Sequence, residues 1–235
     1  MLVSPVPNKR SPMQRAEVIV LCGGRGIRMG PLTDNEQKCM FVYHGKPILE
    51  HLLDVISDDF RKARIILAVG YKHQNIKKYF GARYKDLDIE YTKPNSDGTK
   101  EALIEAEESI FNDRFYLIEG DAIIERGNLR KLQRSEGLGS IFCCNDDVTA
   151  PTHPVISHER GLIRRIDYTG EAIKQKGTVR WLCAQQWSRE IFCLCRQEGT
   201  GNMIDVINQN VHLGVKAVIY EGKWHHFADP GDMSR

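Results

Sequence analysis

The sequence of 235 residues predicts an α/β protein with a doubly wound, mostly parallel sheet and a smaller second subregion. Two observations carry this prediction. Short apolar runs typical of strands alternate with segments of helical periodicity from Glu17 onward, which is the pattern of repeated strand–helix–strand units. A glycine-rich turn also follows the first apolar run directly, at the position where open α/β sheets bind ligands.

The individual elements follow from the length and periodicity of the apolar segments. Short runs rich in Val, Ile and Leu predict buried strands, and apolar residues spaced three or four apart predict helices. The expected order is strand 17–22, helix 46–57, strand 64–69, helix 73–80, strand 87–92, a helix with apolar positions from 102 to 110, strand 115–118, and strands at 141–144, 154–157 and 162–166.

Composition divides the chain into a leader and one domain. Residues 1–15 hold three prolines and little apolar periodicity, so we expect a mobile leader in which Met13 is an alternative start. Residues 16–235 are long enough to bury a continuous core. Within them we expect one half at about 16–140 and the other at about 141–235.

The charge and cysteine content exclude several classes of protein. A net charge of +2 indicates no broad surface for nucleic acid or an anionic membrane. No apolar stretch approaches a membrane span, and the amino terminus has no apolar signal core. The seven cysteines lie mostly in apolar runs without C-x-x-C spacing, which favours free buried thiols and a cytoplasmic location.

The segment after the first strand has the properties of a phosphate-binding loop. Three glycines let backbone amides approach an anion closely, because no side chain intervenes and a positive φ costs little. Three basic side chains add fixed positive charge, and a guanidinium binds phosphate oxygens in pairs. A surface turn with incidental basic residues is the structural alternative. These six residues are Gly23, Gly24, Gly26, Arg25, Arg28 and Lys38.

The segment VIVLCGGRGIRMGPLTDNEQK, with HGKPI after it, resembles the opening motif of the sugar-phosphate nucleotidylyltransferase family. That family includes glucose-1-phosphate thymidylyltransferases and mannose-1-phosphate guanylyltransferases, and its motif runs G-G-x-G-T-R-L-x-P-L-T, then P-K, then G-K-P. Ile27 replaces the usual threonine and Gln37 the usual proline, but neither change removes a charge or an amide. Transferases that begin G-G-x-S-x-R-M-G are the nearest competitors, and the longer spacing to Lys38 argues against them.

The resemblance implies a Rossmann-like nucleotidyltransferase. Such an enzyme joins a nucleoside triphosphate to a phosphorylated small molecule, here a sugar 1-phosphate, and releases pyrophosphate. By resemblance, Arg28 and Lys38 are catalytic and stabilise the phosphates. The implied nucleotide-binding residues are Leu21, Gly23, Gly24, Arg25, Gly26, Lys93, Gly98 and Thr99.

Two of these implied nucleotide contacts leave an alternative open. Gly98 and Thr99 open a helix and match a family element that contacts base and ribose, although a plain helix cap explains them as well. Lys93 occupies the position of a family glutamine that often contacts a pyrimidine base, so the identity of the base of the nucleotide is left open.

A carboxylate at the end of the strand 115–118 is the expected cation ligand. Asp121 follows Glu119 and Gly120 there, and a carboxylate at the carboxyl end of a central strand suits Mg²⁺, which prefers oxygen ligands. The resemblance also gives this aspartate to the metal, as a catalytic residue. A turn aspartate that satisfies local amides is the alternative.

The second half departs from the family pattern at two places. No E-K-P motif follows the strand 162–166, and Glu171 and Lys174 are the nearest candidates for binding the acceptor, although a solvated surface is the alternative for the lysine. Near the carboxyl terminus, WHHFADPGD resembles W-x-D-x-G-T-P-x-D, which aligns His226 with the second metal-binding aspartate and Asp229 with the threonine.

The histidine at this position leaves the metal chemistry open. Imidazole is a poor Mg²⁺ ligand, so either Asp229 reaches the cation through a shifted loop, or Mn²⁺ is used, or catalysis is lost. A zinc site built on His225 and His226 is a further alternative.

Other functions therefore remain open beside the sugar enzyme. One is a cytidylyltransferase for phosphocholine or another phosphoalcohol, which would account for the missing E-K-P. Another is a catalytically silent relative that binds a nucleotide sugar and regulates a partner. Expected partners are a nucleoside triphosphate and a phosphorylated acceptor, with no nucleic acid and no membrane, and a homo-oligomer is compatible with the sequence.

Overall fold

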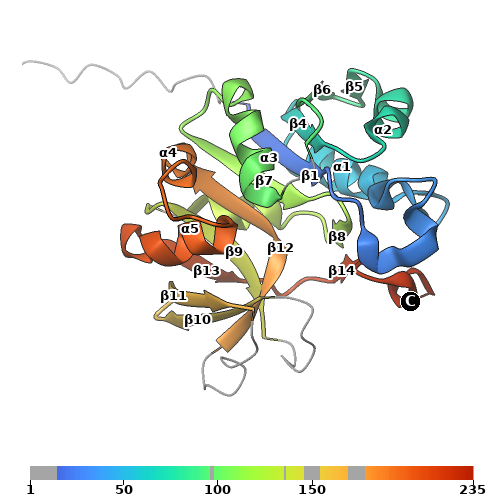
Figure 1. Cartoon of the computed structure of the whole chain (residues 1–235). Helices are drawn as coiled ribbons and strands as arrows, with labels where there is room; N and C mark the ends of the chain where they lie inside the picture. Colours follow the sequence, from blue (N-terminus) through green and yellow to red (C-terminus); the bar gives the residue numbers. More distant parts are fainter. Residues whose placement is uncertain (1–14, 96–97, 135, 146–153, 169–177, 235) are drawn as a thin grey trace, which may run out of the picture.

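The computed structural model describes residues 15–95, 98–134, 136–145, 154–168 and 178–234. In this part of the chain, one sheet of ten strands runs through the molecule in the order β10-β11-β13-β9-β12-β7-β1-β4-β6-β5 (Figure 1). Its strands are β1 Glu17–Cys22, β4 Arg64–Val69, β5 Arg83–Tyr84, β6 Leu87–Tyr91, β7 Arg114–Glu119, β9 Gly139–Cys144, β10 Val155–Glu159, β11 Leu162–Asp167, β12 Thr178–Ser188 and β13 Val215–Ile219.

Helices cover both faces of this sheet, which confirms the doubly wound α/β fold. Alternate side chains of a strand point to opposite faces. In β1, Val18 and Val20 therefore pack with α1, while Ile19 packs with α3 on the other face. The helices are α1 Ile48–Asp59, α2 His73–Phe80, α3 Thr99–Ala106, α4 Ile191–Cys195 and α5 Met203–Asn210.

The parallel strands of the sheet come mainly from the amino-terminal half of the chain. Strands β7, β1, β4 and β6 run parallel to one another, whereas β12 is antiparallel to both β7 and β9. Strands β9 and β13 are again parallel. The sheet is therefore mixed rather than mostly parallel, because β12 runs opposite to β7 and β9, and β5, β10 and β11 also pair antiparallel with their neighbours.

Most predicted boundaries agree with the structure to within one or two residues. The largest difference is in the helix with expected apolar positions up to residue 110, which ends at Ala106. The first helix begins at Ile48 rather than at residue 46. Lys46 and Pro47 instead form the short strand β3, which pairs with β2, Val42–Tyr43. Pro47 has an extended backbone at the helix N-cap, so the helix cannot extend further back.

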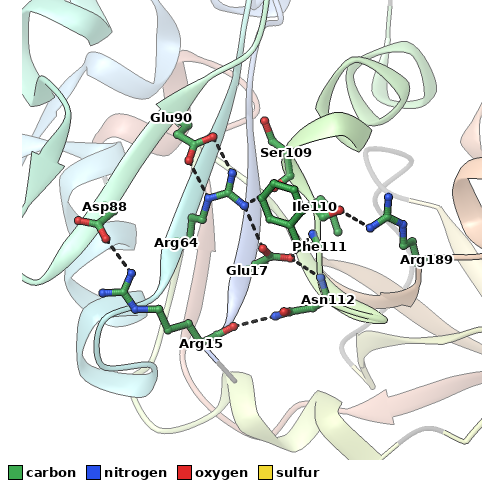
Figure 2. Close-up of polar contacts among 10 residues, drawn as sticks. All are labelled: Arg15, Glu17, Arg64, Asp88, Glu90, Ser109, Ile110, Phe111, Asn112 and Arg189. Carbon is green, nitrogen blue, oxygen red and sulfur yellow. Dashed lines mark hydrogen bonds and ion pairs between the residues drawn. The ribbon is translucent and has the colours of Figure 1, made fainter. Parts of the chain in front are cut away.

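The amino ends of the parallel strands are tied together by a buried carboxylate (Figure 2). Glu17 is only 4% exposed. Its carboxylate accepts hydrogen bonds from the backbone amides of Phe111 and Asn112, both at 2.9 Å, and from Arg64 at 3.0 Å. Arg64 also pairs with Glu90 on β6 at 2.7 Å. This network joins β1, β4, β6 and the turn before β7.

The carboxyl-terminal segment returns to the amino-terminal half of the chain. Strand β14, Trp224–His226, pairs antiparallel with β8, Ala122–Ile124, directly after the end of β7. In this register His226 lies opposite Ala122, and the amide of Phe227 donates to the carbonyl of Asp121 at 3.0 Å. Residues about a hundred positions apart are thus neighbours. In the ranges described above, no helix is long and apolar enough to span a membrane.

Candidate active site

Two glycines of the loop after β1 are required by the local geometry. A Cβ on Gly23 would lie 2.5 Å from the carbonyl oxygen of Asn95, closer than any side chain allows. Gly26 has a φ of 67°, in the left-handed region that favours glycine. Gly24 is exposed, and its Cβ position is open in the described structure. The loop therefore approaches the segment after β6 closely, and its outer edge at Gly24 leaves room for a ligand.

Gln37, which replaces a family proline, fastens this loop to the segment that carries the lysine. Its side chain is buried, and its Nε2 donates to the carbonyls of Cys22 at 2.8 Å and Gly24 at 3.1 Å. Its Oε1 accepts from the amide of Cys39 at 2.6 Å. Every polar atom of this buried amide group is thus used to fix backbone on both sides of Lys38.

Lys38 and Asp121 form a largely buried ion pair at the carboxyl ends of β1 and β7. Burial alone would raise the pKa of Asp121, but His226 and Lys38 hold it well below its usual range. The carboxylate is therefore ionised throughout the physiological range. A charged oxygen at this position is ready to bind a cation.

Glu119, Asp121 and His226 form a cluster that could hold one divalent cation. One ligand atom from each lies within 4.8 Å of the others. The Nε2 of His226 is 3.4 Å from Glu119 and 3.5 Å from Asp121. Burial lowers the pKa of His226, but the two carboxylates outweigh it and raise that pKa above 6.5. Two carboxylates and an imidazole are a donor set that divalent metals accept, so the residues fit such an ion.

The neighbouring histidine has a different role. Adjacent residues of a strand point to opposite sides. The ring of His225 accordingly stacks on Tyr43, with centroids 5.5 Å apart, and its Nε2 lies 2.8 Å from the carbonyl oxygen of Asp232. His225 therefore anchors β14, and it faces away from the cluster that His226 joins.

A cavity of about 220 Å³ lies between the glycine loop, the amino end of α3 and the cation cluster. Thr99 begins α3 on the cavity wall, so the unpaired amides of the first helical turn lie beside it. Lys38 lies on the same wall. The cavity thus combines backbone hydrogen-bond donors, the positive charge of Lys38 and two carboxylates. A phosphate chain that binds together with a divalent cation requires these groups.

The cavity brings together most of the residues predicted from the sequence. Eight of them line it: Leu21, Gly23, Gly24, Gly26, Lys38, Gly98, Thr99 and Asp121. His226 lies beside it through its contacts with the two acidic residues.

Four predicted residues lie outside the cavity wall. Arg25 lies over the ring of Tyr71, 5.5 Å from its centre. Arg28 and Lys93 are exposed. The exposed Asp229 accepts a hydrogen bond from the amide of Gly231 at 3.1 Å and is not part of the cation cluster. Glu171 and Lys174 lie outside the described residues.

The sequence interpretation missed three residues that the structure places at the site. Asn95 and Gln37 line the cavity, and Glu119 contributes the third ligand of the cluster. The pattern Glu-Gly-Asp at the end of β7 contained a signal for Glu119, because carboxylates two apart at a strand end lie close together. Nothing in the sequence pattern distinguished Asn95.

Comparison with known proteins agrees with this geometry. The model of the family described as nucleotidyl transferase matches residues 17–153, which is more than half of the chain. The chain belongs to this family. The resemblance read from the glycine motif is thereby confirmed.

Curated relatives match about half of this chain. The bifunctional protein GlmU of Methanocaldococcus jannaschii is 38% identical over 109 residues, which is 46% of this chain and 26% of that protein. The UTP–glucose-1-phosphate uridylyltransferase AglF of Haloferax volcanii is 33% identical over 129 residues, or 54% of this chain and 52% of that protein. The matched segments thus cover between a quarter and about half of these relatives.

Solved structures extend the similarity of fold to nearly the whole chain. A UDP-glucose pyrophosphorylase from Acinetobacter baumanii superimposes with a TM-score of 0.83 at 13% identity, covering 94% of this chain and 91% of that one. A glucose-1-phosphate thymidylyltransferase from Bacillus anthracis, itself described as putative, gives 0.79 at 18% identity, with coverage of 94% and 93%. At these identities the agreement concerns the fold, which the second half therefore shares.

Proposed function

We propose that this protein transfers a nucleotidyl group from a nucleoside triphosphate to a sugar 1-phosphate, forming a nucleotide sugar and pyrophosphate. The observation that carries the proposal is the position of the cation cluster of Glu119, Asp121 and His226 opposite the glycine loop, across one cavity. Family membership and the named activity of the AglF relative support it.

The proposed reaction is an in-line displacement at phosphorus. A phosphate oxygen of the acceptor forms a bond to the α-phosphorus, while the bond to the pyrophosphate oxygen breaks. Amides of the glycine loop bind the triphosphate, and Lys38 and Arg28 stabilise the charge that develops on its oxygens. The protein forms no covalent bond, so its contribution is positioning and electrostatic stabilisation.

A divalent cation completes this proposal. Bound by Glu119, Asp121 and His226, it would neutralise charge on the phosphates and help to orient them. Mg²⁺ is the cation expected from the family, and Mn²⁺ suits the imidazole better. Lys38 pairs with Asp121, so we expect a cation bound by this carboxylate to free the lysine for the phosphates.

The remaining assignments are also proposals. Residues 16–140 would bind the nucleotide and residues 141–235 the acceptor, for which Glu171 and Lys174 stay candidates. Buried thiols such as Cys22 and Cys183 favour the cytoplasm as the compartment.

Pyrophosphate release tests the activity. Purified protein is offered each of the four common nucleoside triphosphates with glucose 1-phosphate, mannose 1-phosphate or phosphocholine, in Mg²⁺ or Mn²⁺. We expect turnover with at least one sugar 1-phosphate, and loss of more than a hundredfold on Asp121→Asn. Glu159→Gln is the matched control, because this carboxylate is exposed and is not among the residues that line the cavity.

Two outcomes would reject the proposed activity, and a third would reject the proposed site. Turnover with CTP and phosphocholine alone would assign the protein to phosphoalcohols. Binding of a nucleotide sugar without any turnover would assign it a regulatory role. Undiminished turnover in Asp121→Asn would show that the cation cluster has been wrongly identified.

A further inference from the structure

A second cavity lies at the other end of the parallel strands and contains buried polar atoms that the fold leaves unused. It has a volume of about 820 Å³. Its floor is the sheet surface at β7 and β12, and its walls are the carboxyl end of α1, the residues after it and the 3₁₀ turn η4, Leu129–Arg134. Arg114 begins β7 here and Glu119 ends it, so roughly 17 Å of strand separates this cavity from the cation cluster.

Strand pairing places three polar side chains together on this floor. Gln186 on β12 lies directly opposite Tyr116 on β7, and Arg114 is two residues before that tyrosine. Residues opposite each other in a sheet, and residues two apart on one strand, point to the same face. Tyr116 packs on Phe60 at the end of α1, with ring centres 4.6 Å apart, so this face is the one that α1 covers.

Two buried atoms on the floor lack a hydrogen-bond partner among the described residues. Gln186 is only 4% exposed, and its Oε1 accepts no hydrogen bond. The guanidinium of Arg114 donates from Nη2 to the carbonyl of Gly137 at 2.6 Å, but its buried Nη1 donates to nothing. A buried polar group without a partner loses its hydrogen bonds to water and gains none in return, so native proteins rarely leave such groups without an occupant.

The charges around the cavity indicate the sign of that occupant. Five of its lining residues are basic and two are acidic, in a chain whose total net charge is only +2. One of the acidic residues, Asp58, is already paired with Arg126 at 3.0 Å, and one of the basic residues, Arg15, is paired with Asp88 at 2.9 Å. The basic residues are Arg15, Arg61, Lys62, Arg114 and Arg130.

We propose that this cavity binds a small phosphorylated polyol, whose phosphate is held by Arg114 with Arg61 and Lys62 and whose hydroxyl donates to Gln186. An anion alone would satisfy the guanidinium but would leave the amide oxygen without a donor. A neutral polyol could donate to the amide oxygen and accept from the guanidinium, but it would leave the positive charge of Arg114 without a counter-charge. A ligand with both groups satisfies both buried atoms, and this site is separate from the proposed reaction and does not depend on it.

Calorimetric titration with glycerol 3-phosphate tests the proposal, with inorganic phosphate and glycerol as comparison ligands. We expect glycerol 3-phosphate to bind more tightly than either. The double substitution of the exposed Arg61→Ala and Lys62→Ala should weaken it by about tenfold or more. Gln186→Leu should reduce its affinity to that of inorganic phosphate. Lys78→Ala, an exposed cation on α2, is the matched control and should change nothing.

The glycine loop also has phosphate-binding chemistry, so the two sites must be distinguished. Binding that persists in Lys38→Ala, and slower hydrogen exchange over residues 58–62 and 112–116 of the unmodified protein, would support the second site. Binding that Lys38→Ala abolishes would overturn the proposal. So would the absence of binding to the unmodified protein, or an affinity that neither the double substitution nor Gln186→Leu changes.

Discussion

Replacing Glu17 by glutamine should weaken the fold without reaching the cavity at the other end of β1. The carboxylate is 4% exposed and accepts from two backbone amides and from Arg64. A glutamine keeps one acceptor oxygen but turns an amide donor toward groups that also donate. One buried donor is then left unsatisfied, at a cost of about 1–3 kcal/mol, and the charged contact with Arg64 contributes about 1–2 kcal/mol more.

The expected loss is therefore about 3 kcal/mol of unfolding free energy. For a chain of this length that corresponds to a Tm lowered by about 6–12 °C. Urea unfolding followed by far-UV circular dichroism and tryptophan fluorescence measures the free energy, and calorimetry measures the Tm. The matched control is Glu159→Gln, whose partner Arg164 lies at 2.9 Å but on the exposed surface, and this substitution should cost less than about 0.5 kcal/mol. If Glu17→Gln were as stable as this control, the buried network would have no energetic importance.

Three further predictions concern acid stability, the glycine loop and the cation. Burial opposes the ionisation of Asp54, but its hydrogen bonds, led by the one from Lys46, lower its pKa from 3.8 to about 2. The ionised carboxylate therefore adds about 2 kcal/mol to the free energy of unfolding above pH 3.8, and this contribution is lost as the pH falls through 2. Asp54→Asn should be less stable by that amount in urea at pH 7, and the difference should shrink below pH 3. Gly23→Ala should lower nucleotide affinity and Tm because its Cβ meets a backbone carbonyl, whereas Gly24→Ala should keep the wild-type Tm, and equal melting of the two would contradict the close approach. His226→Asp should shift calorimetric cation preference from Mn²⁺ toward Mg²⁺, and an unchanged ratio would exclude the imidazole as a ligand.

Local patterns were sufficient to predict most of the fold. The apolar run 17–22 and the glycines after it predicted a buried strand and a loop at its end, because both depend on neighbouring residues only. The same holds for the helix 73–80. The reversed direction of β12 has no such local signal, since it depends on which strands the chain meets after a long excursion.

The candidate site was predictable where its residues lie in one motif and not where distant segments meet. Asp121 follows its strand directly, so its position was evident. The choice between His226 and Asp229 depended on how β14 pairs with β8, and the register brings the imidazole to the carboxylates. The role of Gln37 could not be predicted from the sequence. The replacement of the family proline by glutamine does not indicate what the new side chain contacts, whereas in the structure its buried amide group binds three backbone groups.

The pairing of β14 with β8 has a consequence for the order in which the protein folds. Two ligands of the cluster lie at the end of β7, but the third arrives only when a segment a hundred residues later has docked beside them. A folding intermediate with a formed amino-terminal half and an undocked tail would have the glycine loop but only two of the three cluster residues in place. Uptake of a paramagnetic ion during refolding would therefore time the final step of assembly, separately from the earlier appearance of secondary structure.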